Sequence, residues 1–182
     1  MFGYARVALE ECCAILDSRR KPVTKAAREK GDYPYYGANG IQDYVADYIF
    51  DGSYVLVGED GSVVTADGHP VVTWAEGKMW VNNHAHIIEG NDLAHTRFLF
   101  YYLQTVNVSG MIHGNIPKLN QGDFKSIVIM LPSLEKQKEI IALLNRFHNL
   151  CNDITEGLPA EIEARQKQYE YYRDRLLSFK EI

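Results

Sequence analysis

The chain has 182 residues, of which 46% are hydrophobic and 12% aromatic, and its formal net charge is −5 at pH 7. This composition excludes a disordered chain and predicts one core-forming domain with an extension. The negative net charge argues against a general affinity for nucleic acid. The three cysteines lack the two-residue spacing of zinc and redox sites, so we expect no metal cluster and no disulfide framework. No hydrophobic run approaches the ~18 residues of a membrane span, and we expect a cytoplasmic protein without a membrane partner.

Basic residues are concentrated near the N-terminus. Residues 1–30 contain seven Lys or Arg against four Asp or Glu, whereas residues 31–130 contain four against eleven. Such a positive block can bind phosphate groups, or it can be the solvated end of a helix or a loop. Its members include Arg19, Arg20, Lys21 and Lys25.

Between residues 32 and 131, short hydrophobic runs alternate with Gly, Asn and Asp, which is typical of a strand-rich domain with many turns. The predicted strands are Tyr44–Ile49, Ser53–Val57, Val71–Trp74, Met79–Val81 and His86–Ile88. We expect a mostly buried helix from Leu93 to Gln104. Pro132 and Ser133 end this region, because proline disfavours a preceding helical residue and serine caps a following helix.

From Ser133 to about Lys180 the sequence predicts one very long helix. Hydrophobic residues recur at alternating spacings of three and four, which is the pattern of a coiled-coil seam. A slip near residues 157–159 indicates a stutter or kink. At about 1.5 Å per residue the helix would span roughly 65–70 Å, so its seam requires a partner chain. The seam residues are Ile140, Leu144, Phe147, Ile154, Tyr169, Tyr172 and Leu176. The predicted fold is therefore α+β, with a globular strand-rich domain (1–131) followed by a long coiled-coil helix (132–182).

Several runs of this sequence carry a resemblance to a known family. They are Tyr33–Ile41, Phe50–Gly61, Trp80–His86, Gly114–Gln121, Pro132–Gln137 and Tyr169–Leu177. Together they resemble the target-recognition domain and the conserved helix of type I restriction-modification specificity subunits, and the similarity covers nearly the whole chain.

The resemblance implies a non-catalytic protein without a cofactor. Such a subunit holds double-stranded DNA and docks adenine-methylating modification subunits, and with them the restriction subunits. Family members usually carry two recognition domains and two conserved helices, whereas this sequence supplies one of each. We therefore expect a homodimer through antiparallel C-terminal helices, with a palindromic bipartite target. A second interpretation is a protein-interaction module that pairs with a full-length specificity subunit and modulates its assembly without reading DNA.

Candidate DNA contacts follow from side-chain chemistry. Amides suit adenine edges, while Lys and Arg suit guanine or phosphate. Ser109–Lys118 is the better candidate for approach to a groove, because its glycines allow the backbone near phosphates. Pro34–Gly40 and Asn82–His86 can instead be structural motifs. The predicted DNA-binding residues are Arg19, Arg20, Lys21, Lys25, Asn39, Arg97, His113, Asn115, Lys118, Asn120 and Gln121.

Two metal-dependent alternatives are weaker. Asp67, Glu76 and Lys78 have the outline of a magnesium-dependent nuclease site, although acid-x-Lys triples are common by chance. His84 and His86 alternate along a predicted strand and could be metal ligands, but no third ligand is evident, and a hydrogen-bonded structural pair is the simpler interpretation. The sequence also lacks the Pro-Pro dipeptide of an adenine methyltransferase loop and a glycine-rich cofactor loop.

Overall fold

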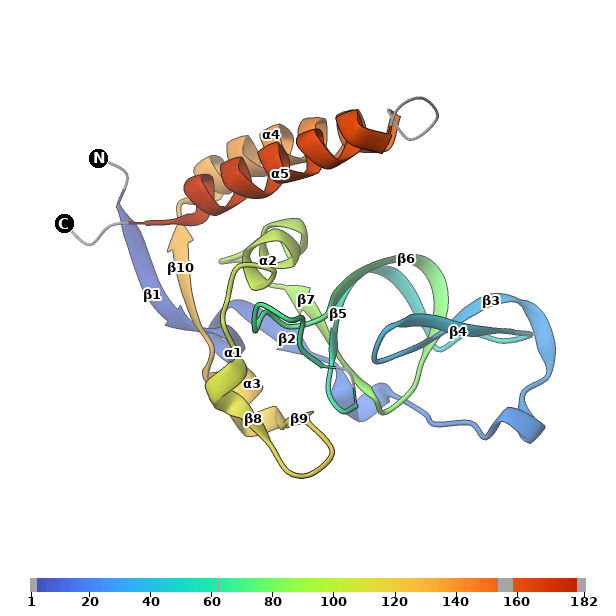
Figure 1. Cartoon of the computed structure of the whole chain (residues 1–182). Coiled ribbons are helices and arrows are strands. Elements are labelled where there is room, and N and C mark those ends of the chain that lie inside the picture. The colour runs from blue at the N-terminus through green and yellow to red at the C-terminus, as the bar shows by residue number, and fades with distance from the viewer. Residues whose placement is uncertain (1–2, 62, 154–158, 180–182) are drawn as a thin grey trace.

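A computed structural model describes residues 3–61, 63–153 and 159–179 of the chain. It places a strongly curled mixed sheet beside a pair of long helices, and a two-stranded ribbon stands at one side of the molecule (Figure 1). Within the described residues, no helix is both long enough and hydrophobic enough to cross a membrane.

The main sheet has six strands in the order β2-β7-β5-β6-β3-β4. Only the pairing of β3 with β6 is parallel. The strands are β2 (Cys13–Ile15), β3 (Lys30–Gly37), β4 (Gly40–Val45), β5 (Phe50–Gly58), β6 (Val72–Val81) and β7 (Ala85–Gly90). The remaining elements before the long helices are β1 (Tyr4–Ala8), α1 (Leu9–Cys12), η1 (Asp17–Arg19), η2 (Lys25–Ala27), α2 (Thr96–Leu103), η3 (Ser109–Met111), β8 (Ile112–His113), β9 (Lys118–Leu119), α3 (Gln121–Ser126) and β10 (Val128–Pro132).

The curl of the sheet coincides with two facing glycines. Gly52 of β5 lies opposite Gly77 of β6 in the antiparallel register. Gly77 has φ +84°, a conformation that residues with a Cβ rarely adopt. Glycine inside a strand weakens it and permits a bend, and Figure 1 shows both strands curving strongly. The bend carries β3 and β4 away from the rest of the sheet.

The predicted strands are confirmed in the centre of the sheet. Ser53–Val57 lies within β5, and His86–Ile88 lies within β7. Val71–Trp74 and Met79–Val81, predicted as separate strands, belong mostly to the single strand β6, because the chain does not turn back between them. The prediction Tyr44–Ile49 is wrong from Ala46 onward, since β4 ends at Val45.

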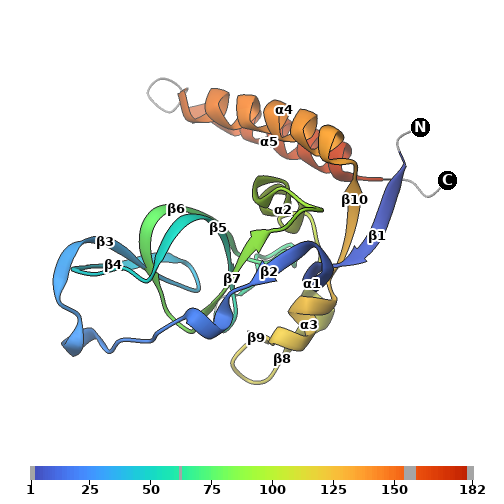
Figure 2. The ribbon, with the colours of Figure 1, turned by 180° about the vertical axis from the view of Figure 1, so that it is seen from behind.

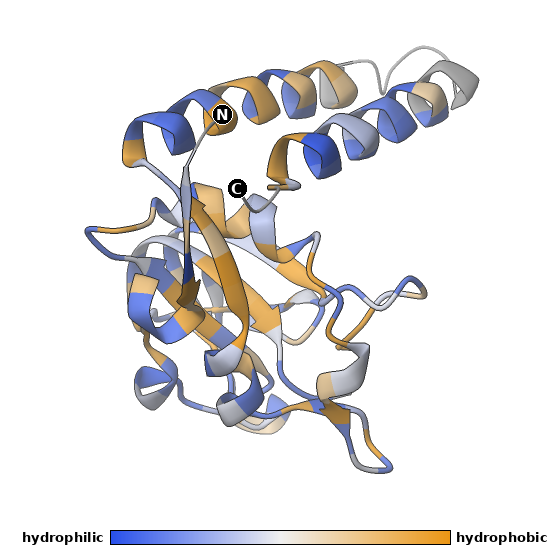
Figure 3. Cartoon of the chain, turned by 90° about the vertical axis from the view of Figure 1, so that its left-hand side faces the viewer, coloured by the Kyte–Doolittle hydropathy of each residue, from blue (hydrophilic) through white to orange (hydrophobic). Residues whose placement is uncertain are grey.

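Hydrophobic side chains cover both faces of the sheet. On one face, Val55 and Val57 are fully buried beneath α2, which contributes Phe98 and Leu99. The predicted helix is therefore confirmed over Thr96–Leu103, with a later start than expected. The alternate residues of β5, including Leu56, are buried within the curl of the sheet. Figure 3 shows that hydrophobic residues are concentrated on the strands, whereas the long helices mix both types.

The C-terminal region differs from the predicted single helix. Two helices, α4 (Leu134–Asp153) and α5 (Pro159–Leu177), lie side by side in Figures 1 and 2, and we call them the helical arm. Their rings meet at Phe147 and Tyr172, which stack with centroids 5.4 Å apart. The sequence has Gly157 shortly before Pro159, the first residue of α5, and both residue types disfavour a continuous helix. As a result, α5 covers part of the seam of α4. The expectation that nothing in the chain covers this seam is therefore wrong; Ile154 lies outside the described residues.

The helical arm is joined to α2 through a buried glutamine. Gln137 is fully buried, and its Oε1 accepts the His95 backbone N–H at 2.9 Å. Its Nε2 donates to the carbonyls of Leu93 and Pro132, also at 2.9 Å. Two of the predicted seam residues on α4, Ile140 and Leu144, are buried in the same core as α2. The arm is thus fixed to the sheet through α2.

Candidate nucleic-acid interface

Two segments lie on the side of the sheet away from the helical arm. One is the basic segment from η1 to η2, residues 17–27, and the other is the β8–β9 loop, His113–Lys118 (Figures 1 and 2). Nine of the eleven predicted DNA-binding residues belong to these two segments or follow the loop within three residues; the exceptions are Asn39 and Arg97. This face is therefore where the predicted contacts come together.

Asp17 is the centre of the network that fixes both segments. Its Oδ1 accepts the backbone N–H of Ile87 at 3.0 Å, and its Oδ2 accepts from His86 Nδ1 at 2.6 Å and from Gln121 Nε2 at 3.1 Å. Burial of the side chain raises the pKa of Asp17, but the hydrogen bond and charge of His86, with Ile87 and Arg20, outweigh that effect and lower the pKa overall. We call Asp17, Arg20, Glu59, His86, Lys118 and Gln121 the Asp17 network.

His86 is fully buried between two acceptors. Its Nδ1 faces Asp17, while its Nε2 lies 2.9 Å from the Leu119 carbonyl. Both ring nitrogens therefore lie within hydrogen-bond distance of an oxygen. The ring also stacks on Phe124 of α3, with centroids 4.3 Å apart and planes inclined by 6°. His86 therefore ties β7 to β9 and α3.

Glu59, directly after β5, completes the charge balance of the Asp17 network. Its carboxylate pairs with Arg20 at 2.6 Å and with Lys118 at 3.2 Å. Arg20 also pairs with Asp17 at 3.3 Å and donates to the Ala85 carbonyl at 2.6 Å. Its side chain is only 11% exposed, so we correct its predicted role: Arg20 is an internal ion-pair partner, not a DNA contact.

The β8–β9 loop is held at its base and exposed at its tip. The N–H of Leu119 donates to the Glu59 carbonyl at 2.9 Å, and the N–H of Gly61 donates to the Pro117 carbonyl at 3.0 Å. Asn115 and Ile116 are exposed, with Ile116 at 71%. A short loop with a fixed base and an exposed tip is a suitable shape for approach to a groove.

The other polar residues around this loop differ in the exposure of their side chains and in the partners that they already bind. Lys118 keeps 47% of its side chain exposed despite its pairing with Glu59, and His113 lies 3.1 Å from Asp123 with 61% exposed. Asn120 is the N-cap of α3: its Oδ1 accepts the Asp123 backbone N–H at 3.0 Å. Gln121 is exposed but donates to Asp17. Asn120 and Gln121 therefore have structural partners that the sequence did not indicate.

The basic segment presents its remaining cations to solvent. Arg19, Lys21 and Lys25 are exposed, and the Arg19 guanidinium lies over the Phe50 ring at 4.7 Å from its centroid. Lys21 and Lys25 form no ion pair with the described part of the chain. Asn39 is exposed in the turn between β3 and β4. These four residues remain predicted DNA contacts.

Arg97 was predicted to contact DNA from its residue type, but it lies away from the candidate interface. It lies on α2 beneath the helical arm, where its guanidinium is 4.4 Å from the centre of the Trp74 ring and 4.9 Å from that of Phe100. Its Nε donates to Asn145 Oδ1 of α4 at 3.2 Å. Arg97 therefore joins α2 to the arm, on the side of the sheet away from the candidate interface, and we remove it from the DNA-contact set.

The alternative metal sites are not supported by the contacts. Glu76 accepts from the indole N–H of Trp74 at 3.1 Å, and Lys78 lies over the Tyr48 ring at 4.6 Å, so the nuclease outline does not converge on one point. Asp17, Glu59 and His86 do have ligand atoms within 4.8 Å of one another. The pairings of Arg20 and Lys118 already balance those carboxylates, which identifies the cluster as an ion-pair network.

Sequence reasoning missed Asp17 and Glu59 as functional positions. An acidic residue inside the basic segment, at Asp17, was the available signal, because a lone acid among cations is a candidate for an internal ion pair. Glu59 carried no comparable signal, since its partners lie far away in sequence. Arg20 is separated from it by 39 residues.

The chain is similar in sequence and in fold to known proteins. A sequence profile described as the type I restriction modification DNA specificity domain matches residues 2–164. The chain is 40% identical over 179 residues to a putative type I restriction enzyme specificity subunit of Haemophilus influenzae, covering 96% of this chain and 46% of that protein. It is 32% identical over 181 residues to a putative type I specificity subunit of Mycoplasma pneumoniae, covering 94% and 72%. The crystal structure of a type I restriction-modification S subunit from M. genitalium matches with a TM-score of 0.70 at 14% identity, covering 85% of this chain and 41% of that one.

Proposed function

Because the chain belongs to the type I restriction-modification DNA specificity family, we propose that it reads DNA sequence for such a system in the cytoplasm. Specificity subunits are non-catalytic, and the methyltransferase is a separate subunit. The chain spans about half the length of the Haemophilus relative. We therefore infer that residues 1–131 read one half of a bipartite target, and that residues 132–182 dock the methyltransferase subunits and, with them, the restriction subunit.

The observation that carries this proposal is the fixed base and exposed tip of the β8–β9 loop, on the same side of the sheet as Lys21 and Lys25 (Figure 1), which form no ion pair with the described part of the chain. Lys21 and Lys25 can neutralise phosphates, which positions a protein on the duplex without reading its sequence. Asn115 and Lys118 can reach base edges, where amides and ammonium groups discriminate bases. The Asp17 network holds the two segments together, so the loop and the cations would meet DNA as one surface.

The second part of the proposal concerns the helical arm. We infer that two copies pair by exchanging α5, so that α4 of each copy packs against α5 of the other. The contacts would be those that already join α4 and α5 within one chain, such as the stacking of Phe147 on Tyr172. An exchange of identical elements is a low-cost route to a dimer. The heptad spacing of the seam supports this pairing.

A disulfide measures the exchange directly. In a Cys151→Ser background, Phe147→Cys and Tyr172→Cys are introduced together and oxidised, and the product is sized on a non-reducing gel. Exchanged helices give a covalent dimer, whereas an arm closed within one chain gives a monomer with an internal disulfide. Light scattering of the unmodified chain, with mass near twice 20.7 kDa expected for a dimer, is the companion measurement. A monomer by both methods refutes the exchange.

The DNA-reading function is tested by determining which DNA sequence becomes methylated when the chain is present. The chain is co-expressed with a type I modification subunit, and methylated adenines in the host DNA are mapped. We expect one bipartite motif, which becomes palindromic if the copies pair. Asn115→Ala with Lys118→Ala should abolish or change the motif, whereas Glu76→Gln on β6, which is exposed and outside both the predicted DNA contacts and the docking segment, should leave it unchanged. Assembly with the modification subunit but no methylated motif would refute DNA reading and favour the assembly-modulating alternative.

A further inference from the structure

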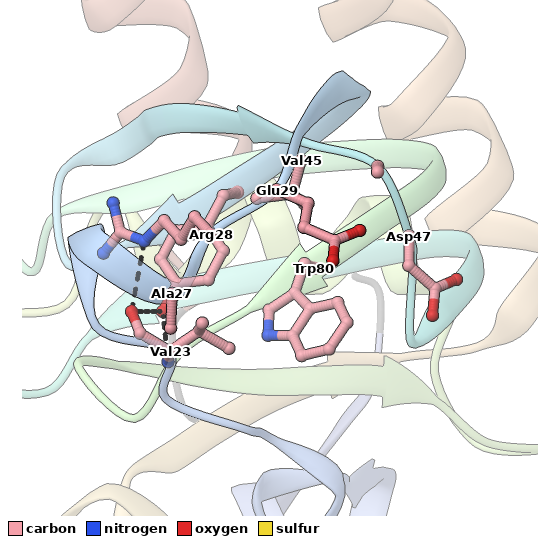
Figure 4. A pocket seen from close by; sticks show the side chains of 9 residues that line it. Val23, Ala27, Arg28, Glu29, Val45, Asp47 and Trp80 are labelled. Carbon is pink, nitrogen blue, oxygen red and sulfur yellow. Dashed lines mark hydrogen bonds between the residues drawn. The ribbon is translucent and has the colours of Figure 1, made fainter.

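A pocket of about 180 Å³ opens beside the basic segment, between η2 and strands β3, β4 and β6 (Figure 4). Val23, Ala27 and Val45 contribute apolar surface, and the aromatic residues Tyr35 and Trp80 also line the pocket. The pocket is smaller than typical cofactor sites, which enclose roughly 300–1,000 Å³. It is therefore suited to a single flat ring or one side chain.

The walls of the pocket are fixed by hydrogen bonds. The Tyr35 hydroxyl accepts the Val23 backbone N–H at 3.0 Å, and Tyr35 itself is 1% exposed. The Trp80 indole N–H donates to the Lys21 carbonyl at 2.6 Å. Arg28 donates from Nε to the Val23 carbonyl at 3.1 Å and pairs with Asp43 at 3.2 Å. A ligand would thus enter a pre-formed site.

Two carboxylates stand at the pocket. Glu29 and Asp47 are exposed, and Figure 4 shows the Glu29 side chain reaching toward the Trp80 indole. The Glu29 carboxylate has no partner among the residues that the structure describes. Carboxylates beside an aromatic face can receive a cation, or they can accept hydrogen bonds from the amino group of a nucleobase.

The position of Arg28 decides between a cation and a nucleobase as the ligand. Its guanidinium already lies over the Tyr35 ring, 4.0 Å from the centroid, and so occupies the cation site of that ring. A second cation would meet this positive charge, whereas a flat base can stack on indole and guanidinium planes. Exposed lysines flank the pocket at Lys21, Lys25 and Lys30 and would attract phosphates.

We propose that this pocket binds one unstacked nucleobase that carries an exocyclic amino group, which includes cytosine, adenine and guanine and excludes thymine, with the ring on Trp80 and the amino group on Glu29. The inference rests on the proposed DNA-reading function and adds a second contact point to it, separate from the β8–β9 loop. It predicts that a base next to the target is drawn out of the stack when the protein binds.

Tryptophan fluorescence tests the proposal. The chain has two tryptophans, so Trp74→Phe leaves Trp80 as the single reporter. Short oligonucleotides of deoxycytidine, deoxyadenosine or thymidine are titrated into this variant. Deoxycytidine and deoxyadenosine should quench Trp80 and bind about fivefold or more tightly than thymidine, which offers no exocyclic amino group. Trp80→Leu should weaken binding of the deoxycytidine oligonucleotide about tenfold, measured by anisotropy.

A matched acid–tryptophan pair provides the control. Glu29→Gln should remove the preference over thymidine, because an amide both donates and accepts. Glu76→Gln, measured by anisotropy in the chain that retains Trp74, lies on the same strand but outside the pocket and should leave the preference intact. Equal quenching by all three oligonucleotides, an equal effect of Glu76→Gln, or quenching by an arginine-rich peptide that displaces deoxycytidine would each overturn the proposal. Methylation mapping distinguishes failure of the pocket proposal from failure of the DNA-reading proposal. If the methylated motif is retained but the oligonucleotides show no base preference, only the pocket proposal is refuted.

Discussion

Replacing Gln137 by alanine should loosen the attachment of the helical arm. The substitution removes three hydrogen bonds and leaves the His95 N–H and the carbonyls of Leu93 and Pro132 without their partner. An unsatisfied buried group costs about 1–3 kcal/mol. Two of the three bonds are only partly buried, so water can replace part of the loss. We therefore expect a decrease of about 2–4 kcal/mol in the free energy of unfolding.

Urea unfolding followed by circular dichroism measures this decrease. Gln166→Ala is the control, because the Gln166 side chain is exposed and, within the part of the chain that the structure describes, hydrogen-bonds to Glu170 on its own helix. It should change stability by less than about 0.5 kcal/mol. Gln137→Glu keeps the size of the side chain but places a carboxylate against two carbonyl oxygens, so it should also destabilise at neutral pH. A loss below about 1 kcal/mol for Gln137→Ala would refute the view that this glutamine fixes the arm.

Three further predictions concern charge. Lys21→Ala and Lys25→Ala should each weaken duplex binding at all sequences and reduce the slope of log affinity against log salt by about one, measured by anisotropy, while Lys167→Ala on α5 should change neither. Because the folded pKa of Asp17 is lowered, its stabilisation is present above its unfolded pKa of about 4 and is lost as pH falls through the folded value; Asp17→Asn should flatten this acid limb in thermal unfolding, and an unchanged limb would contradict the assignment. Arg97→Ala should destabilise the chain by about 1–3 kcal/mol in urea without changing the salt slope, and a reduced slope would restore Arg97 as a DNA contact.

The sequence predicted local elements well where the signal was local. Ser53–Val57 and His86–Ile88 are short hydrophobic runs bounded by turn residues, and both are strands. The pairing of β1 with β10 was not predicted, because Tyr4 meets Pro132 across almost the whole domain. Such a pairing leaves no trace in the periodicity of either segment. The same holds for β2, a short strand of three residues.

The candidate site was predictable by residue type but not by partner. Exposed cations at Lys21 and Lys25 follow from a polar, turn-rich segment. Arg20 and Arg97 have the same chemistry, yet their donors are used inside the protein. The Asp17 network is equally non-local, since Asp17 and Gln121 are 104 residues apart. A single sequence does not indicate which acidic side chain forms an ion pair with which basic side chain far away along the chain.

The helical arm shows why a heptad pattern leaves its partner open. The spacing of Leu144, Phe147 and Cys151 predicts that these side chains meet another helix, but the pattern is the same whether that helix belongs to this chain or to a second copy. Within one chain, Phe147 meets Tyr172, and Cys151 Sγ lies 3.7 Å from the Arg165 carbonyl. Exchange between copies would keep these contacts and change only their connection. The choice then depends on the short segment between the helices and on protein concentration, because the contacts contribute equally to both forms.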